Sequence, residues 1–222
     1  MKKIRKFIVF IVTLSLFLTS SLPTHASKST KSLTLTDDFE VKQTVDNGGI
    51  VHAQVITEDQ INEIIYNPET GETYLDGKII PMEVKKSFDE SIELTLDRNQ
   101  LIFPKAIATP PGAGGAKYLG THVYDIPAGT LLSSAITLIS IWTRVPASRI
   151  KQTLIWLVGT AVTQPLDKLL DVEIRQYRTS KKVKEGNMCY PQYKFKNFSQ
   201  ILYRSKRSNT FESSWFLGSR PC

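Results

Sequence analysis

Few side chains in this 222-residue chain have the types and spacing that catalysis requires. Beyond residue 26 the histidines are His52 and His122, and the sequence contains neither an HExxH nor a CxxC pair that would hold a metal ion. Cys189 could act as a nucleophile only as a free thiolate near His122. The glycines of residues 110–115 match no phosphate-binding loop. We therefore predict no catalytic residue, no metal ligand and no cofactor.

Carboxylates are the remaining candidates for chemistry. Asp89, Glu90 and Glu93 lie close together in the sequence, but paired catalytic acids are defined by their separation in space rather than by their abundance. We interpret them as part of a charged surface, and an extracellular hydrolase is only the third functional hypothesis.

The first 26 residues have the pattern of a bacterial secretory signal peptide. A basic start (Lys2, Lys3, Arg5, Lys6) precedes an apolar run over residues 7–18, and the small-residue site Thr24-His25-Ala26 follows. This run is shorter than the roughly 20 residues that a membrane-spanning helix needs. We predict cleavage after Ala26 and a secreted, extracellular protein.

Two cysteines, Cys189 and Cys222, are present in the whole chain. In an oxidising compartment, such an even and minimal number favours one disulfide. The sequence therefore predicts a bridge that ties the C-terminus to the preceding strands, and an oxidised Cys189 cannot act as a nucleophile.

Charge is divided between the two halves of the chain. Residues 27–103 contain 15 acidic and 7 basic residues, whereas residues 104–222 contain 6 acidic and 17 basic residues. We expect the halves to attract each other, with the acidic half shielding the basic one. The basic half favours anionic partners, and salt should weaken such binding.

The acidic half, residues 27–103, is predicted to be a strand-rich domain. Asn47-Gly48-Gly49 separates two alternating apolar runs and indicates a hairpin. Thr57 and Gln60 match a capping box, which predicts a short helix through Ile65. Turns at 67–71 and 76–77 enclose a further strand, and Ile92, Leu94 and Leu96 alternate as another strand would.

The rest of the chain divides into three predicted segments. Residues 104–125, rich in Pro and Gly, are expected to be a linker. Residues 126–171 carry two uncharged stretches around a cationic turn, which predicts an apolar helical hairpin that Pro165 interrupts or restarts. Residues 172–222 alternate as strands, which completes the basic domain 126–222. The predicted fold class is α+β: a strand-rich N-terminal unit, an apolar helical hairpin and C-terminal strands tied by one disulfide.

The helical hairpin could engage membranes, because an apolar helix pair with basic flanks can dock on an anionic bilayer and then bury apolar surface. A helix of this length is short for the hydrocarbon core, so interfacial insertion or a homo-oligomer on the membrane is easier than a lone spanning hairpin. The equal alternative is that these helices form a buried core. The residues predicted to engage the membrane are Leu131, Leu132, Ile136, Leu138, Ile139, Trp142, Leu154, Ile155, Trp156, Leu157, Val158 and Val162. Those predicted to contact an anionic surface are Arg144, Arg149, Lys151, Lys194, Lys196, Arg204, Lys206 and Arg207.

Nucleic acid is not an expected partner. Basic residues alternate with aromatic ones between Tyr190 and Tyr203, a pattern that could contact phosphates and bases. A strand with a solvated basic face explains the same pattern, and the protein is predicted to leave the cell.

The combination of export signal, acidic strand-rich half, basic half with an uncharged hairpin and terminal cysteine pair resembles the large, heat-labile, secreted bacteriocins of Bacillus relatives, the geobacillin-like group. The resemblance implies killing of related Gram-positive bacteria by membrane disturbance, with an anionic lipid membrane or cell-wall polymer as partner. It transfers no role to any individual residue. The alternative function is a non-enzymatic, wall-associated or inhibitor-type binding protein.

Overall fold

The computed structural model describes residues 30–36, 39–85, 107–184 and 190–218. The predicted signal peptide, the alternating run Ile92-Leu94-Leu96, the acids Asp89, Glu90 and Glu93, and both cysteines lie outside these residues. Within them the fold is α+β and strand-rich, with two helices and two antiparallel sheets, as the sequence predicts at this coarser level.

The first sheet, sheet A, is a meander in which each strand pairs with the next in sequence. Its strands are β1 (Thr30–Thr36), β2 (Phe39–Val45), β3 (Val51–Ile56), β4 (Ile61–Tyr66), β5 (Thr73–Leu75) and β6 (Lys78–Ile79). The predicted turn at Asn47-Gly48-Gly49 joins β2 to β3, and Asp76 and Gly77, both with positive φ, join β5 to β6. Both hairpins are confirmed.

The helix predicted to begin at Thr57 is wrong, because Ile61–Tyr66 is strand β4. Thr57 and Gln60 instead close the turn between β3 and β4. The Thr57 backbone N–H donates to the Gln60 carbonyl at 2.9 Å, and the Gln60 N–H donates to the Thr57 hydroxyl at 3.2 Å. A threonine hydroxyl can accept such a bond in a turn as readily as at a helix start.

The second sheet, sheet B, has the order β11-β10-β9-β8-β7. Its strands are β7 (Met82–Lys85), β8 (Ala116–Ile126), β9 (Leu170–Thr179), β10 (Lys194–Tyr203) and β11 (Lys206–Arg207), and β12 (Phe211–Glu212) and β13 (Phe216–Leu217) also pair with β10. The predicted linker is therefore wrong for residues 116–125, which form most of β8. The residues from Pro110 to Gly115 precede this strand, and Gly120 lies within it, where the register with β9 shifts. The β8 residues Tyr118, Val123 and Tyr124 suit a sheet.

The helices are shorter than the predicted hairpin of residues 126–171. They are α2 (Leu132–Thr143) and α3 (Ala147–Val158), while Ile126 ends β8 and Leu170 begins β9. Gly159 adopts the left-handed conformation and ends α3. The helical restart predicted at Pro165 is wrong, because Pro165 forms a β-bridge with Leu131.

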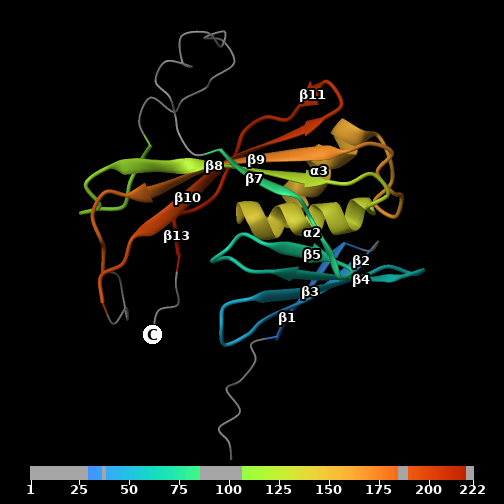
Figure 1. Cartoon of the computed structure of the whole chain (residues 1–222), viewed down its shortest axis with the longest axis horizontal. Helices are drawn as coiled ribbons and strands as arrows, with labels where there is room; N and C mark the ends of the chain where they lie inside the picture. Colours follow the sequence, from blue (N-terminus) through green and yellow to red (C-terminus); the bar gives the residue numbers. More distant parts are fainter. Residues whose placement is uncertain (1–29, 37–38, 86–106, 185–189, 219–222) are drawn as a thin grey trace, which may run out of the picture.

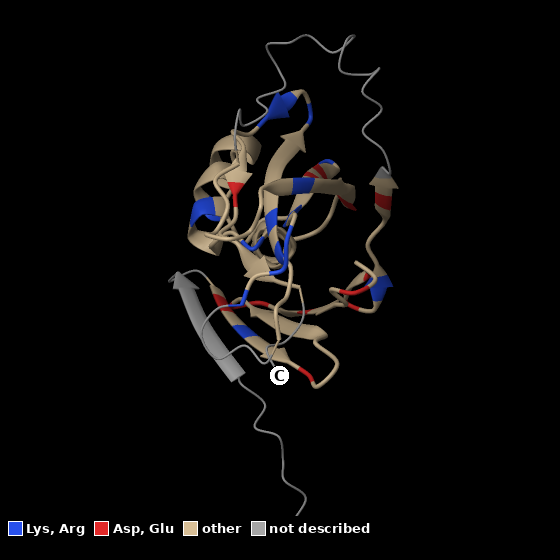
Figure 2. Cartoon of the chain, turned by 90° about the vertical axis from the view of Figure 1, so that its left-hand side faces the viewer, with Lys and Arg blue, Asp and Glu red and all other residues tan. Residues whose placement is uncertain are grey.

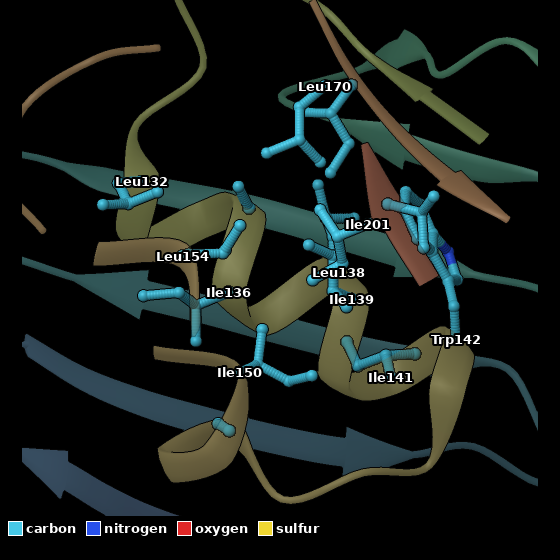
Figure 3. Close-up of a cluster of buried hydrophobic side chains, with 14 of the residues drawn as sticks. Leu132, Ile136, Leu138, Ile139, Ile141, Trp142, Ile150, Leu154, Leu170 and Ile201 are labelled. Carbon is cyan, nitrogen blue, oxygen red and sulfur yellow. The ribbon is translucent and has the colours of Figure 1, made fainter. Parts of the chain in front are cut away.

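Helix α2 lies between the two sheets and contacts both β3 and β10 (Figure 1). Nearly every α2 side chain is buried, and Leu132, Ile136, Leu138 and Ile139 have no exposed surface. One apolar cluster joins them to Val41 and Val55 of sheet A and to Leu170 and Ile201 of sheet B, among others (Figure 3). A helix that is apolar around its whole circumference needs such cover on every side.

The hydroxyl groups along α2 are buried with the apolar side chains. The Thr137 hydroxyl donates to the Ser133 carbonyl at 3.0 Å, and the Thr143 hydroxyl donates to the Ile139 carbonyl at 2.7 Å, both within the helix. The Ser134 hydroxyl donates to the Asn62 side chain of sheet A at 3.2 Å. Bonding of this kind offsets the cost of burying a polar group.

Charge remains divided in the folded chain. Between residues 39 and 80 sheet A and its turns contain eight acidic and two basic residues, and Figure 2 shows more red than blue there, with blue more frequent in the part that contains sheet B. The contact between these parts is the apolar cluster around α2. Burial of apolar surface, rather than charge attraction alone, holds the two halves together.

We expect Ile139→Ala to lower the free energy of unfolding by about 2–5 kcal/mol, because it opens a cavity where α2 meets the sheets. Ile155→Ala on the outer surface of α3 is the matched control and should change stability by less than about 0.5 kcal/mol. Urea unfolding followed by circular dichroism measures both. Equal effects of the two substitutions would contradict the burial of α2.

Candidate functional site

A cavity of about 240 Å³ opens at the C-terminal end of α2, between sheet A and sheet B. Its lining comes from the turn after β4, from β8, β9, β10 and β13, and from the last residues of α2 and the residue that follows it. Segments far apart in the sequence meet here, since the turn belongs to the acidic half and the other elements to the basic half. The cavity is the candidate binding site of the described part of the chain.

Trp142 and Tyr124 form a rigid floor. Their rings stack with centroids 4.2 Å apart and an interplanar angle of 11°. The Trp142 indole Nε1 donates to the Thr73 hydroxyl at 2.9 Å, and the Asn197 side-chain Nδ2 donates to the Trp142 carbonyl at 3.1 Å. Trp142 therefore joins α2 to both sheets: its indole bonds to Thr73 of sheet A and stacks on Tyr124 of sheet B, and its backbone carbonyl accepts from Asn197 of sheet B.

Tyr124 of the floor and the neighbouring Tyr66 supply two phenol groups. Burial raises the pKa of Tyr66, and the nearby Arg144 guanidinium offsets part of that rise. Burial also raises the pKa of Tyr124, as does its hydrogen bond to the Tyr66 hydroxyl. Both groups therefore stay protonated at neutral pH and supply uncharged hydroxyls to the cavity.

Phe195 and Phe216 form half-buried walls, with ring centroids 6.2 Å apart. Gly218 packs against Phe195 so closely that a Cβ there would lie 2.5 Å from a ring carbon. Gln176 adds an amide, and its Nε2 lies 3.5 Å from the side-chain oxygen of Asn197. The walls thus combine aromatic faces with polar amide groups.

The rim carries one charge of each sign. Arg144 is exposed and follows α2 in the left-handed conformation, with its guanidinium carbon 5.5 Å from the centre of the Phe216 ring. Glu69 is exposed on the opposite turn, where its backbone N–H donates to the Asn67 side chain at 2.9 Å. Gly71 closes this turn with φ +79°, and a Cβ there would lie 2.8 Å from the Met82 sulfur. Any other residue would be strained by the positive φ and would displace the Met82 side chain.

His122 also lines the cavity, from β8, where it lies opposite Ile174 of β9 and Val84 of β7. Burial lowers its pKa, so the imidazole is neutral at pH 7. Its Nδ1 is buried without a protein hydrogen-bond partner. His122 is a neutral polar group here rather than a cation.

Most residues that the sequence assigned to membrane contact lie in the interior. Of that set, Leu132, Ile136, Leu138, Ile139, Trp142, Leu154, Leu157 and Val162 are buried, and Leu131 and Val158 are half-buried. Ile155 and Trp156 are the exposed members, at 40% and 69%. No helix among the described residues is long and apolar enough to cross a bilayer.

The residues predicted to contact an anionic surface are not gathered in one place. Arg144 lies on the cavity rim, Arg149 is exposed on α3, Lys151 on α3 and Lys194 on β10 are half-buried, and Arg204, Lys206 and Arg207 are exposed on the hairpin of β10 and β11. Lys196 is buried and paired with Glu212, with its Nζ 5.6 Å from the centre of the Phe198 ring. The expectation that Lys196 contacts a surface is therefore wrong, since its ammonium group is already enclosed.

The described residues contain no group of His, Cys, Asp or Glu arranged to hold a metal ion. The sequence also gave no sign of the cavity. The sequence predicts membrane contact for Trp142 and no role for Tyr66, Tyr124, Gln176 and Phe216, because their proximity exists only after the sheets have paired.

Comparisons with protein-family models, with curated proteins and with solved structures find no match to this chain. By its fold and its cavity, the chain is a strand-rich α+β protein with a small pocket lined by polar and aromatic side chains.

We expect Thr73→Val to lower the free energy of unfolding by about 1–3 kcal/mol, because the buried Trp142 Nε1 loses its acceptor. Thr163→Val, at an exposed threonine, is the matched control and should have little effect. Chemical unfolding quantifies both. A Thr73→Val protein as stable as the control would show that the indole finds another acceptor.

Acid should destabilise the protein through His122. Because its pKa is lower in the folded chain than the ordinary value of about 6.5, the unfolded chain binds more protons, and stability falls as the pH falls below that value. His122→Gln should flatten this dependence between about pH 7 and pH 5, as measured by urea midpoints. His52→Gln, which leaves His122 in place, should retain it, and an unchanged slope in His122→Gln would refute the assignment.

Proposed function

We propose that this chain is a secreted antibacterial protein, bacteriocin-like in its action on related Gram-positive bacteria, and that it docks on their anionic membranes while it remains folded. The observation that carries the proposal is the exposure of Trp156 beside Ile155 on the outer surface of α3. The export pattern and the charge of the basic half support it.

The surface of α3 suits a membrane interface. Arg149, Gln152 and Trp156 follow one another at helical spacing and are exposed, and Ile155 adjoins them. An indole is favoured where an apolar region meets a polar one, and each cation near an anionic bilayer contributes about 1 kcal/mol. Docking through a few side chains should therefore be reversible and sensitive to salt.

Release of α2 into the bilayer is the less favourable route. The α2 side chains would exchange one apolar environment for another, but the sheet side chains that α2 covers would be exposed to water, at about 1.5–3 kcal/mol for each large one. At least four of these are completely buried in the cluster around α2: Val55, Ile64, Leu170 and Ile201. Such a loss approaches the whole stability of a typical domain, about 5–15 kcal/mol. Folded docking keeps the core intact and uses the side chains that are already exposed.

Binding to vesicles tests the docking step. Purified protein should bind anionic phosphatidylglycerol vesicles at low salt, and the double variant Ile155→Ser/Trp156→Ser should lose at least about tenfold in affinity, which corresponds to about 1.4 kcal/mol. Leu169→Ser, which removes another exposed apolar side chain outside α3, is the matched control. Wild-type binding and growth inhibition that survive the double substitution would refute the role of α3.

The second candidate function is a non-enzymatic binding protein of the cell wall or of inhibitor type. The observation that favours it is the hairpin of β10 and β11, where Arg204, Lys206 and Arg207 are exposed and could contact an anionic wall polymer. Retention on isolated cell walls, without binding to vesicles, would favour this function over the first.

We also propose that Cys189 and Cys222 form a disulfide in the exported protein. On the chain-entropy model a loop of this size stabilises the fold by about 3–4 kcal/mol. The double substitution Cys189→Ser/Cys222→Ser should lower the unfolding free energy by about that amount, and a labelling assay should find no free thiol in the wild-type protein. Two reactive thiols would refute the bridge.

A further inference from the structure

We propose that the cavity at the C-terminal end of α2 binds one sugar ring of a bacterial cell-envelope saccharide. The proposal does not depend on docking of α3, because the cavity is lined by other elements. It assigns a ligand class to a site where aromatic, amide and charged side chains from both halves converge, and the bacterial source of the saccharide rests on the proposed antibacterial function.

The volume of the cavity is sufficient for a ligand about the size of one sugar ring. Pockets for drug-sized molecules commonly enclose about 300–1,000 Å³, and this cavity, at about 240 Å³, lies below that range. One ring fits such a volume, whereas a folded peptide or a lipid tail does not. A longer saccharide would place one unit in the cavity and extend the others outward past the rim.

The polar groups of the cavity both donate and accept hydrogen bonds. Tyr66 supplies a neutral hydroxyl, Gln176 an amide, and Glu69 and Arg144 provide one acceptor and one donor of opposite charge at the rim. Sugar hydroxyls have the same dual character. A purely apolar ligand would leave these groups unpaired, at about 1–3 kcal/mol each where they are buried, and a simple anion would be repelled by Glu69.

The aromatic walls suit the apolar face of a sugar ring. Phe195 and Phe216 are half-buried, so part of each ring remains accessible. The Arg144 guanidinium lies above Phe216 and is thereby held near the opening. Because the guanidinium covers one face of Phe216, a sugar ring that packs against Phe195 or against the accessible part of Phe216 would lie beside this cation, which could donate to its hydroxyl groups.

The floor of the cavity, Trp142 and Tyr124, is already ordered before a sugar binds, and this favours tighter binding. Trp142 is fixed by its stack on Tyr124 and by hydrogen bonds that reach both sheets. Binding therefore requires little further ordering of the protein, which reduces the entropic cost of association.

Calorimetric titration of the purified protein tests the proposal. The probes are N-acetylglucosamine, its β-1,4-linked trimer, sodium acetate as a simple anion and decanoate as an apolar chain. We expect saturable binding of the two sugars, with the trimer binding at least as tightly as the monomer. Absence of sugar binding, or tighter binding of acetate or decanoate, would overturn the proposal.

Two cavity variants and one matched control locate the binding. Arg144→Asn keeps a residue that tolerates the left-handed conformation and should weaken sugar binding roughly tenfold, as expected from the loss of one charge-assisted hydrogen bond. Phe216→Ala should weaken it similarly. Arg149→Asn, on the exposed surface of α3, should leave sugar affinity unchanged and weaken vesicle binding instead.

These readouts separate the two proposals. Sugar affinity that is equal in the wild type and in both cavity variants, with thermal unfolding unchanged, would overturn the cavity assignment whatever the vesicle result. Loss of vesicle binding alone would bear only on the docking of α3.

Discussion

The requirement that helix α2 be covered around its whole circumference governs this structure. Its sequence has no charged residue, and its serines and threonines are buried with the apolar side chains, except for the half-buried Ser140. One sheet can cover only one side of a helix. A second sheet and the buried face of α3 complete the cover, and this explains why two strand-rich regions of unlike charge form one buried cluster.

The same constraint creates the cavity. Helix α2 lies between the sheets and keeps them apart along its length. Beyond the end of the helix at Arg144, no α2 side chains fill the space between the sheets. Trp142 in the last turn fills part of the space and ties the sheets together through Thr73 and Asn197. The remaining space takes its lining from the turn after β4 in sheet A and from β8, β9 and β10 of sheet B, which explains its mixed polar and aromatic character.

The apolar residues of the two helices could serve either as a buried core or as a membrane-binding surface. Hydropathy alone cannot distinguish a helix that is buried among sheets from one that enters lipid, since both environments exclude water. The distinction came from neighbours: α2 contacts both sheets, whereas α3 has one buried face, Ala147, Ile150, Leu154 and Leu157, and leaves Ile155 and Trp156 in solvent. Within these two helices, the exposed apolar side chains are therefore Ile155 and Trp156, a small part of those that hydropathy indicates.

Local chemistry in the sequence determined the hairpins at Asn47-Gly48-Gly49 and Asp76-Gly77, the strand alternation of residues 172–176 and the existence of two apolar helices, because each depends on residues that are neighbours in the chain. The sequence alone does not distinguish a helix cap at Thr57 and Gln60 from a hairpin turn, because the Thr57 hydroxyl can accept the same hydrogen bond in either structure. The pairing of β4 with β3 selects the hairpin turn. Tertiary structure alone placed β8 inside a sheet, buried Lys196 beside Glu212, and gathered Tyr66, Trp142, Gln176 and Phe216 around one cavity. Such contacts join residues many positions apart, and the burial that selects them exists only once both sheets enclose α2.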